Sequence, residues 1–416
     1  MKNILLAIIL ITSFTCSNAQ KHEIYDKGIA SLQVVAGQNW LSLPIIKLNG
    51  NSPNDKINIS FDDLTHTYHR YTYKIEHCQA DWNVSDQLFS SDFINGFQDG
   101  NTIDNSIESI NTNTLYTHYT LQIPNERCSL KMSGNYKLTV FDENDNNRPV
   151  FTACFMVVEP LMGVQLDVTT NTDIDINKSH QQVSMAINYG TLNVIDPNSQ
   201  IKTVVMQNQR WDNAKINAKP QYIVADGLKW EHNRDLIFQA GNEYRKYEIL
   251  DVSHPTMGID RIVWDGNNYQ VYPFPCDPRP NYVYDEDANG CFYIRNSDNV
   301  ENDIASEYVY VNYILNVPQK LDGDIYLNGV WTNDQFTPEY KMTYDEANGC
   351  YTASVFQKQG YYSYQFVLID KQGVSRVVPS EGNFFQTENK YQALVYYRGQ
   401  GDRTDRLVGY QQVQIK

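Results

Sequence analysis

The chain has 416 residues, a length typical of two to four domains. Its 33 Lys and Arg residues against 49 Asp and Glu residues leave a formal net charge of −16, which argues against nucleic-acid or anionic-lipid partners. Hydrophobic residues make up 41% of the chain, enough for several cores, and this excludes wholesale disorder. The 30 tyrosines favour β structure with one wet face, because Tyr suits half-buried pleated surfaces.

The N-terminus has the pattern of a cleaved export signal. Lys2 precedes an apolar run over 4–11, and a small-x-small cleavage signal ends at Ala19. The run is too short to cross a bilayer, which takes about 20 residues. We therefore expect a signal peptide over 1–19 and a soluble mature protein in an oxidising compartment. Cys16 leaves a lipoprotein as the alternative, although the residues before it are larger than those of a usual lipobox.

Six cysteines remain after the expected cleavage, namely Cys78, Cys128, Cys154, Cys276, Cys291 and Cys350. An even number in an exported chain permits disulfides, but six cysteines allow fifteen connectivities. Buried thiols on strands are the alternative for each of them. The sequence contains no CxxC and no Cys/His spacing typical of zinc. We therefore expect neither a metal site nor a cofactor.

Most of the chain alternates apolar and polar residues in short segments, which is typical of β-strands. The clearest segments are 56–61, 71–76, 115–121, 136–141, 183–187, 308–313 and 362–368. Turn dipeptides lie between segments, namely Asp226-Gly227, Asp265-Gly266, Asn289-Gly290 and Asn348-Gly349. Helical turns are expected only near 87–97 and 197–211. The pattern predicts an all-β fold of tandem immunoglobulin-like β-sandwich domains.

Two boundaries divide the predicted sandwiches. The apolar run 150–158 would close the first one, and Glu159-Pro160 would then act as a hinge. The Pro-rich stretch 273–280 would be a loop or linker, because proline removes the donors of a strand ladder. The predicted domains are the signal peptide at 1–19, an N-terminal sandwich at 20–160, a middle sandwich at 161–302 and a C-terminal sandwich at 303–416.

Two acidic segments echo each other, 284–292 and 344–351. Each contains Asn-Gly followed by a cysteine, so each is predicted to be a hairpin turn with positive φ angles. A calcium loop is the alternative, but neither segment has the alternating Asp residues and distal Glu of an EF-hand.

No catalytic motif stands out in the sequence. The chain lacks GxSxG, HExxH, a Walker A loop and GxGxxG, and the pair His66 and His69 has no third ligand at metal spacing. We therefore expect a non-enzymatic protein without catalytic, cofactor-binding or metal-ligating residues. An enzyme would need a site assembled from residues that lie far apart in the sequence.

One weak binding signal lies in the C-terminal third. The segments 323–331, 342–344 and 360–366 resemble the early-set, immunoglobulin-like modules that flank starch-active enzymes. Some of those modules stack sugars on exposed Trp rings. Trp331 therefore makes a glycan-binding exported protein the alternative function, and a core position for Trp331 is the competing interpretation.

A set of stretches in the N-terminal region occurs together, in order, in one known family. These stretches are 44–48, 59–64, 73–82, 93–97, 109–119, 124–125, 133–136 and 155–159. The most specific are HCQADW at 77–82 and YTHY at 116–119, and 241–247 and 360–364 extend the likeness downstream. The chain resembles the plug protein of the type IX secretion system of Bacteroidetes.

The resemblance implies a concrete function. Such proteins are periplasmic, bind the periplasmic mouth of the outer-membrane translocon barrel and close its pore when no cargo is passing. The expected partner is that barrel, without nucleic acid and without direct membrane insertion, and the protein would be monomeric apart from this complex. No barrel-contact residues carry over from the family. A convincing type IX sorting domain is absent, so the chain is interpreted as machinery rather than cargo.

Overall fold

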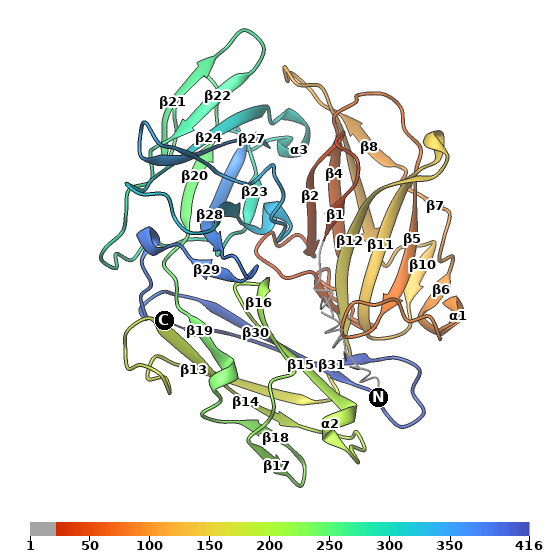
Figure 1. Cartoon of the computed structure of the whole chain (residues 1–416). Coiled ribbons are helices and arrows are strands. Elements are labelled where there is room, and N and C mark those ends of the chain that lie inside the picture. The colour runs from red at the N-terminus through yellow and green to blue at the C-terminus, as the bar shows by residue number, and fades with distance from the viewer. Residues whose placement is uncertain (1–21, 416) are drawn as a thin grey trace, which may run out of the picture.

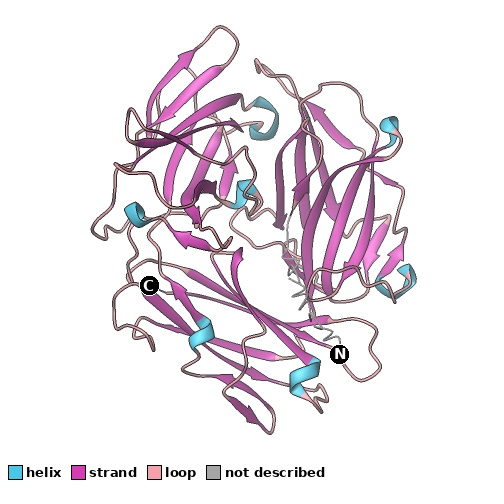
Figure 2. Cartoon of the chain, viewed as in Figure 1, coloured by secondary structure: helices cyan, strands magenta, loops and turns pink. Residues whose placement is uncertain are grey.

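A computed structural model describes residues 22–415 as three β-sandwiches with a few short helical turns (Figures 1 and 2). The all-β prediction is confirmed. The short helices are α1 (Ser90–Phe93), α2 (Pro197–Gln200) and α3 (Asn302–Ala305), with 3-10 turns at Glu143–Asp145, Arg234–Leu236, Val330–Thr332 and Pro379–Glu381. Helices α1 and α2 lie in the two segments predicted to hold helical turns. The predicted signal peptide at 1–19 lies outside the described residues.

The first sandwich packs two sheets that are antiparallel except for the parallel pair β3-β12, with a two-stranded sheet β10-β6 at one end. One sheet has the order β1-β12-β11-β5-β7 with β3 beside β12, and the other has the order β2-β4-β9-β8. Its strands are β1 (Glu23–Ile24), β2 (Ile29–Ala36), β3 (Ile45–Lys47), β4 (Ile57–Asp63), β5 (Tyr71–Cys78), β6 (Ile94–Gly96), β7 (Asn101–Thr102), β8 (Asn105–Glu108), β9 (Thr117–Ile123), β10 (Cys128–Leu130), β11 (Gly134–Asp142) and β12 (Arg148–Val158).

The second sandwich combines the middle of the chain with its C-terminal end. One sheet has the order β13-β14-β18-β17 with β19 beside β14, and the other has the order β16-β15-β30-β31. Its strands are β13 (Gly163–Thr169), β14 (His180–Asn188), β15 (Ile201–Gln207), β16 (Arg210–Ile216), β17 (Tyr222–Val224), β18 (Gly227–Trp230), β19 (Ile237–Gln239), β30 (Lys390–Tyr397) and β31 (Arg406–Gln414).

The third sandwich is inserted between β19 and β30. One sheet has the order β20-β28-β23 with β25 and β29 also paired to β28, and the other has the order β21-β22-β24-β27-β26. Its strands are β20 (Arg245–Ile249), β21 (Ile259–Trp264), β22 (Tyr269–Pro273), β23 (Phe292–Ile294), β24 (Tyr308–Asn316), β25 (Asp324–Asn328), β26 (Thr343–Asp345), β27 (Cys350–Lys358), β28 (Gly360–Ile369) and β29 (Ser375–Val377).

This strand pairing corrects the predicted boundary between 302 and 303. Strand β20 already belongs to the third sandwich, because it pairs with β28, whereas β30 returns to pair with β15 in the second. The Pro-rich stretch begins with the last residue of β22, Pro273, and continues as a loop over 274–280 that lies within the third sandwich and bridges to β24 at Cys276. The linker into that sandwich is 240–244 instead. Pairing between strands so distant in sequence leaves no local signal, so periodicity could not reveal the insertion.

Of the two predicted hairpin turns, the structure contains one and lacks the other. Strands β26 and β27 form the predicted hairpin, with Asp345 opposite Cys350. The prediction is wrong for 284–292, because no strand precedes the turn at Asn289 and Gly290. Both of these residues have positive φ, at 49° and 88°, so the Asn-Gly pair still makes the tight turn that its residue types favour.

Strand β12 is buried on both faces, and this fixes how the first two sandwiches meet. Phe151, Ala153 and Phe155 point into the core of the first sandwich. Cys154 and Met156 point the other way, into a separate apolar cluster that they share with β15, β30 and β31. A strand with two buried faces has no polar alternation, which explains the continuous apolar run over 150–158.

None of the six cysteines in the described part of the chain forms a disulfide. All six are buried, at Cys78, Cys128, Cys154, Cys276, Cys291 and Cys350. Burial raises the pKa of the Cys78 and Cys291 thiols to about 12, which keeps them protonated and unreactive. The interpretation of the cysteines as buried thiols therefore fits this structure, although Cys276 and Cys291 lie outside the strands.

Strand β5 allows a test of which of its two faces lies in the core of the first sandwich. Tyr73 and Ile75 are fully buried in the first core, as their alternation with Lys74 and Glu76 predicts. We expect Ile75→Ala to lower the free energy of unfolding by about 2–5 kcal/mol, because it leaves a cavity among packed side chains. Lys74→Ala, on the other face, should cost less than about 1 kcal/mol. Urea denaturation of both variants checks this, and equal midpoints for Ile75→Ala and wild type would contradict it.

Candidate functional site: the junctions between the sandwiches

The most specific stretches of the sequence lie where the sandwiches meet. HCQADW at 77–82 spans the end of β5 and the turn after it, and three of its residues pack toward the second sandwich. Cys78 and Trp82 are buried in the apolar cluster shared by the two sandwiches, and the Trp82 ring meets Trp211 edge-on with centroids 5.7 Å apart. This cluster also contains Leu43, Ala80, Cys154, Met156, Val158, Val204, Met206, Leu394, Tyr396 and Leu407. Sheet face therefore packs on sheet face, as within a single core.

His77 lies beside this contact and is held by hydrogen bonds within the first sandwich. Its Nδ1 lies 3.0 Å from Ser85 Oγ and its Nε2 lies 3.1 Å from the carbonyl oxygen of Ser133. Burial lowers the pKa of His77 to about 4, so the ring is neutral at pH 7. Gly134, at φ 147°, lies so close that a Cβ there would sit 2.3 Å from His77 Nε2. Glycine is therefore required beside this histidine.

Polar contacts rim the apolar cluster and come from the loop between β30 and β31. The amide of Ala80 donates to Asp405 Oδ2 over 3.0 Å, and Ser85 Oγ lies 2.6 Å from Thr404 Oγ1. Asp405 also pairs with Lys202, with Nζ 2.9 Å from Oδ2. The predicted hinge at Glu159 is held as well, because its amide donates to the carbonyl oxygen of Leu407 over 3.0 Å and its carboxylate pairs with Arg406.

A buried ion pair joins the first sandwich to the third. Asp62 of β4 accepts from Lys358 Nζ of β27 over 2.6 Å, and both side chains are essentially inaccessible, at 0% and 1% exposed. The same carboxylate accepts from Tyr308 OH over 2.7 Å and lies 2.6 Å from His118 Nδ1. Burial alone would raise the pKa of Asp62, but Lys358 and His118 together hold it below its usual range.

YTHY at 116–119 contributes to this same junction. Tyr116 OH donates to the carbonyl oxygen of Ser306 over 2.8 Å, and Lys358 Nζ lies 4.0 Å from the centre of the Tyr116 ring. Just before it, the amide of Ile110 donates to the carbonyl oxygen of Ile304 over 2.8 Å. The stretch 109–119 therefore binds α3 and β24 of the third sandwich.

The downstream stretch 241–247 leads from the second sandwich into the third, and Arg245 within it forms ion pairs inside the third sandwich. Arg245 of β20 pairs with Glu381, with Nη2 2.8 Å from Oε1, and Arg279 pairs with the same carboxylate over 2.6 Å. The amide of Trp211 donates to Asp334 Oδ2 over 3.3 Å, a direct bond from β16 to the third sandwich. Asp287 accepts from the amide of Tyr244, and burial raises the pKa of this carboxyl to about 7.

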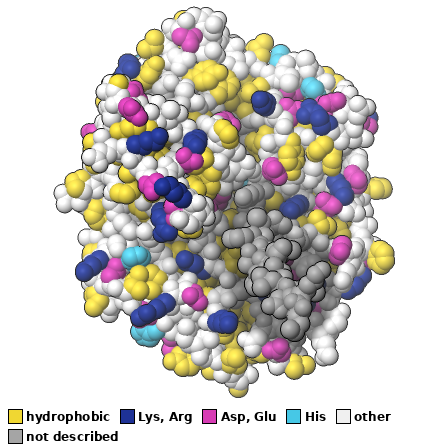
Figure 3. Space-filling view, in the orientation of Figure 1, with side chains coloured by type: hydrophobic (Ala, Val, Ile, Leu, Met, Phe, Trp, Pro, Cys, Tyr) yellow, Lys and Arg dark blue, Asp and Glu magenta, His cyan; other side chains and the backbone are white. Residues whose placement is uncertain are grey.

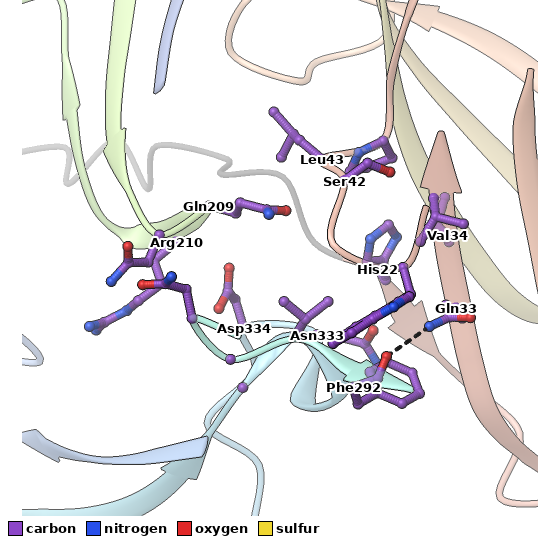
Figure 4. A pocket seen from close by; sticks show the side chains of 18 of the residues that line it. His22, Gln33, Val34, Ser42, Leu43, Gln209, Arg210, Phe292, Asn333 and Asp334 are labelled. Atoms are coloured by element: carbon purple, nitrogen blue, oxygen red, sulfur yellow. Dashed lines mark hydrogen bonds between the residues drawn. The ribbon is translucent and has the colours of Figure 1, made fainter. Parts of the chain in front are cut away.

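The three sandwiches meet around one small cavity (Figure 4). Its volume is about 50 Å³, enough for one or two waters and too small for a substrate. Val34 and Leu43 come from the first sandwich, Arg210 from the second and Asp334 from the third. Gln33 Nε2 bridges two of them by donating to the carbonyl oxygen of Phe292 over 3.2 Å. The junction is a packed contact rather than a ligand pocket.

His69 and Trp331, which the sequence analysis considered as possible site residues, both pack within the sandwiches. His69 Nδ1 lies 2.7 Å from Asp142 Oδ2 and its Nε2 lies 2.8 Å from Thr67 Oγ1, so the ring is held within the first sandwich. Within residues 22–415, no group of His, Cys, Asp and Glu side chains has the arrangement of a metal site. Trp331 is only 8% exposed and packs against Tyr340 and Tyr362. It is the core residue that one of the two interpretations predicted.

The face of the molecule shown in Figure 3 has no strongly charged patch. Acidic and basic side chains are interspersed on the face shown in Figure 3. No helix in the described part of the chain is long and apolar enough to span a bilayer. The sequence did not predict the junction roles of Asp62, Lys358 or Trp211, because partners that lie far apart in the chain leave no spacing signal. The contacts at the junctions can hold the three sandwiches in one arrangement.

Substitutions in the buried Asp62–Lys358 pair test whether it stabilises the junction between the first and third sandwiches. We expect Lys358→Met to lower the free energy of unfolding by about 3–5 kcal/mol, because Asp62 would stay buried without its countercharge. The double variant Asp62→Asn, Lys358→Met should recover much of that loss. Denaturant titration of the three proteins measures both effects.

An exposed ion pair of the same sandwich serves as the control. Lys371 and Asp322 are 71% and 79% exposed, so Lys371→Met should cost at most about 1 kcal/mol. Equal small losses for Lys358→Met and Lys371→Met would show that the buried pair does not hold the junction.

The comparisons with known proteins agree with this arrangement. The family model described as "Type 9 secretion system plug protein 1st domain" matches residues 29–159, which is the first sandwich. A crystal structure of a hypothetical protein from Parabacteroides merdae is 39% identical, with a TM-score of 0.91 over 95% of this chain and 99% of that one. So high a score over nearly the whole length means that the three sandwiches are arranged alike in both. None of the curated proteins compared with the chain matches it. Through its first sandwich, this chain belongs to the type 9 secretion system plug protein family.

Proposed function

We propose that this protein is a non-enzymatic plug that binds the periplasmic end of the type IX translocon barrel and closes its pore. The family of the first sandwich supports the proposal. A pore that passes folded cargo would leak small solutes unless a body of comparable width blocks it. Periplasmic location, reached through the expected signal peptide, and a monomeric state outside the complex belong to the same proposal.

The observation that carries the proposal is the burial of the contacts at the junctions. The apolar cluster around Trp82 and the buried pair Asp62–Lys358 both tie the first sandwich to its neighbours. A seal must resist the passage of solutes, and a chain of loosely linked domains would let them pass between its parts. Three sandwiches with shared buried contacts move as one body, which is the mechanical property that a plug requires.

The binding to the barrel should be reversible. A plug that must leave when cargo arrives needs an interface of moderate size and polar character rather than an obligate apolar one. The interspersed charges of the surface in Figure 3 are compatible with such an interface.

A deletion strain tests the proposal. We expect loss of the gene to leave secretion largely running but to make the envelope permeable to large hydrophilic antibiotics. The leak should disappear when the gene for the barrel is also deleted, and wild-type protein supplied in trans should close it. Unchanged permeability, in cells that demonstrably contain barrels free of cargo, would contradict the plug function.

A further inference from the structure

A polar groove lies on the first sandwich, beside the junction with the third sandwich. It covers the outer face of the sheet β2-β4-β9-β8, which faces the third sandwich, and has a volume of about 850 Å³. That size is typical of sites that bind small molecules and short oligomers. Tyr293 and Asp303 of the third sandwich form part of the opposite wall. Neither the fold nor the proposed sealing of a pore requires a groove here.

Cross-strand pairs of neutral polar side chains form the floor. Asn58 lies opposite Gln122, and Ser60 lies opposite Thr120. Their neighbours in sequence, such as Ile59 and Leu121, point into the core, so these polar side chains face the groove. Amides and hydroxyls both donate and accept hydrogen bonds, which suits a ligand rich in hydroxyl groups.

The backbone of the floor is not available to a ligand. The inner strands β4 and β9, which carry these side chains, use their amide and carbonyl groups in the ladders β2-β4, β4-β9 and β8-β9. A peptide that adds a strand to a sheet needs a free edge, whereas this groove lies across a sheet face. Recognition must therefore come from side chains, and this favours a ligand other than an extended peptide.

His118 places an unpaired, buried polar atom just beneath this floor. The side chain lines the groove and is 8% exposed, and its Nδ1 is held 2.6 Å from Asp62 Oδ1. Its Nε2 has no hydrogen-bond partner among the described residues, although Asp303 Oδ2 lies 3.9 Å away. Because Asp62 is the partner of Nδ1, Nε2 is the ring nitrogen left for a hydroxyl of a ligand.

The remaining walls select against acidic ligands. Asp104, Glu126 and Asp303 line the groove, and Arg127, the one basic side chain there besides His118, is already paired with Asp104. Acidic ligands such as phosphates would be repelled. Trp40, stacked on Tyr293 with ring centroids 5.5 Å apart, also lines the groove and offers apolar aromatic surface.

We propose that this groove binds a neutral oligosaccharide. Neutral amides and hydroxyls pair with sugar hydroxyls, and the Trp40 and Tyr293 rings pack against sugar C–H groups. The floor spans four strands, about 14 Å from β2 to β8, which favours an oligomer over a monosaccharide. The site is distinct from Trp331, which is buried in the third core. The proposal does not depend on barrel binding.

Isothermal titration of the purified mature protein tests the groove with a panel of neutral hexasaccharides made of glucose, mannose, xylose or N-acetylglucosamine. We expect at least one of them to bind, and Ser60→Ala and Gln122→Ala each to weaken that binding at least fivefold. Gln122 is exposed, so its variant should keep the wild-type melting temperature. Gln411→Ala, which removes an exposed glutamine from the second sandwich, is the matched control and should bind like wild type.

Three outcomes would overturn the assignment. The first is the absence of binding to every hexasaccharide at millimolar concentration. The second is binding that Ser60→Ala and Gln122→Ala leave unchanged. The third is that a strand-forming peptide or a uronic-acid hexasaccharide binds and is weakened by these variants, while every neutral sugar fails to bind.

Discussion

The shared burial of two sheet faces is the constraint on which the rest of this structure depends. The outer face of the β12 sheet and the outer face of the β15-β30 sheet would each expose a stripe of large apolar side chains. Packing them together removes both stripes from water and joins two sandwiches at once. Strand β30 must return from the end of the chain to build that face, so the insertion of the third sandwich follows from the same contact.

The contact with the third sandwich has a different physical character. Its centre is the buried pair Asp62–Lys358, and such pairs contribute little net stability because desolvation offsets attraction. A buried ion pair does fix the relative position of the two sandwiches, because a buried charge that fails to meet its partner remains uncompensated. The apolar cluster therefore supplies affinity between sandwiches, and the ionic cluster fixes their orientation. A rigid plug needs both properties.

Local pattern predicts much of this molecule and fails at identifiable places. Alternation identified the strands that contain Ile75 and Tyr310, because each has one face in a core. The apolar run 150–158 indicated a strand buried on both faces, but it did not indicate that the second sandwich packs on its outer face. Lys358 ends a strand and looks like an ordinary surface lysine. Only the fold brings it to Asp62, 296 residues away in sequence. The resemblance in HCQADW and YTHY marked important residues, and the structure supplied their role at the junctions.

The central claim is that the three sandwiches form one stiff body, and spin-label distances test it most directly. Tyr68, Ile195 and Val283 are 80%, 68% and 74% exposed and lie on the first, second and third sandwiches. Labels on the pairs Tyr68→Cys with Ile195→Cys and Tyr68→Cys with Val283→Cys report the two junctions of the first sandwich. The native cysteines are buried and should not react. The account predicts one narrow distance distribution for each pair in frozen solution. Broad or bimodal distributions, with the melting temperature unchanged, would contradict it.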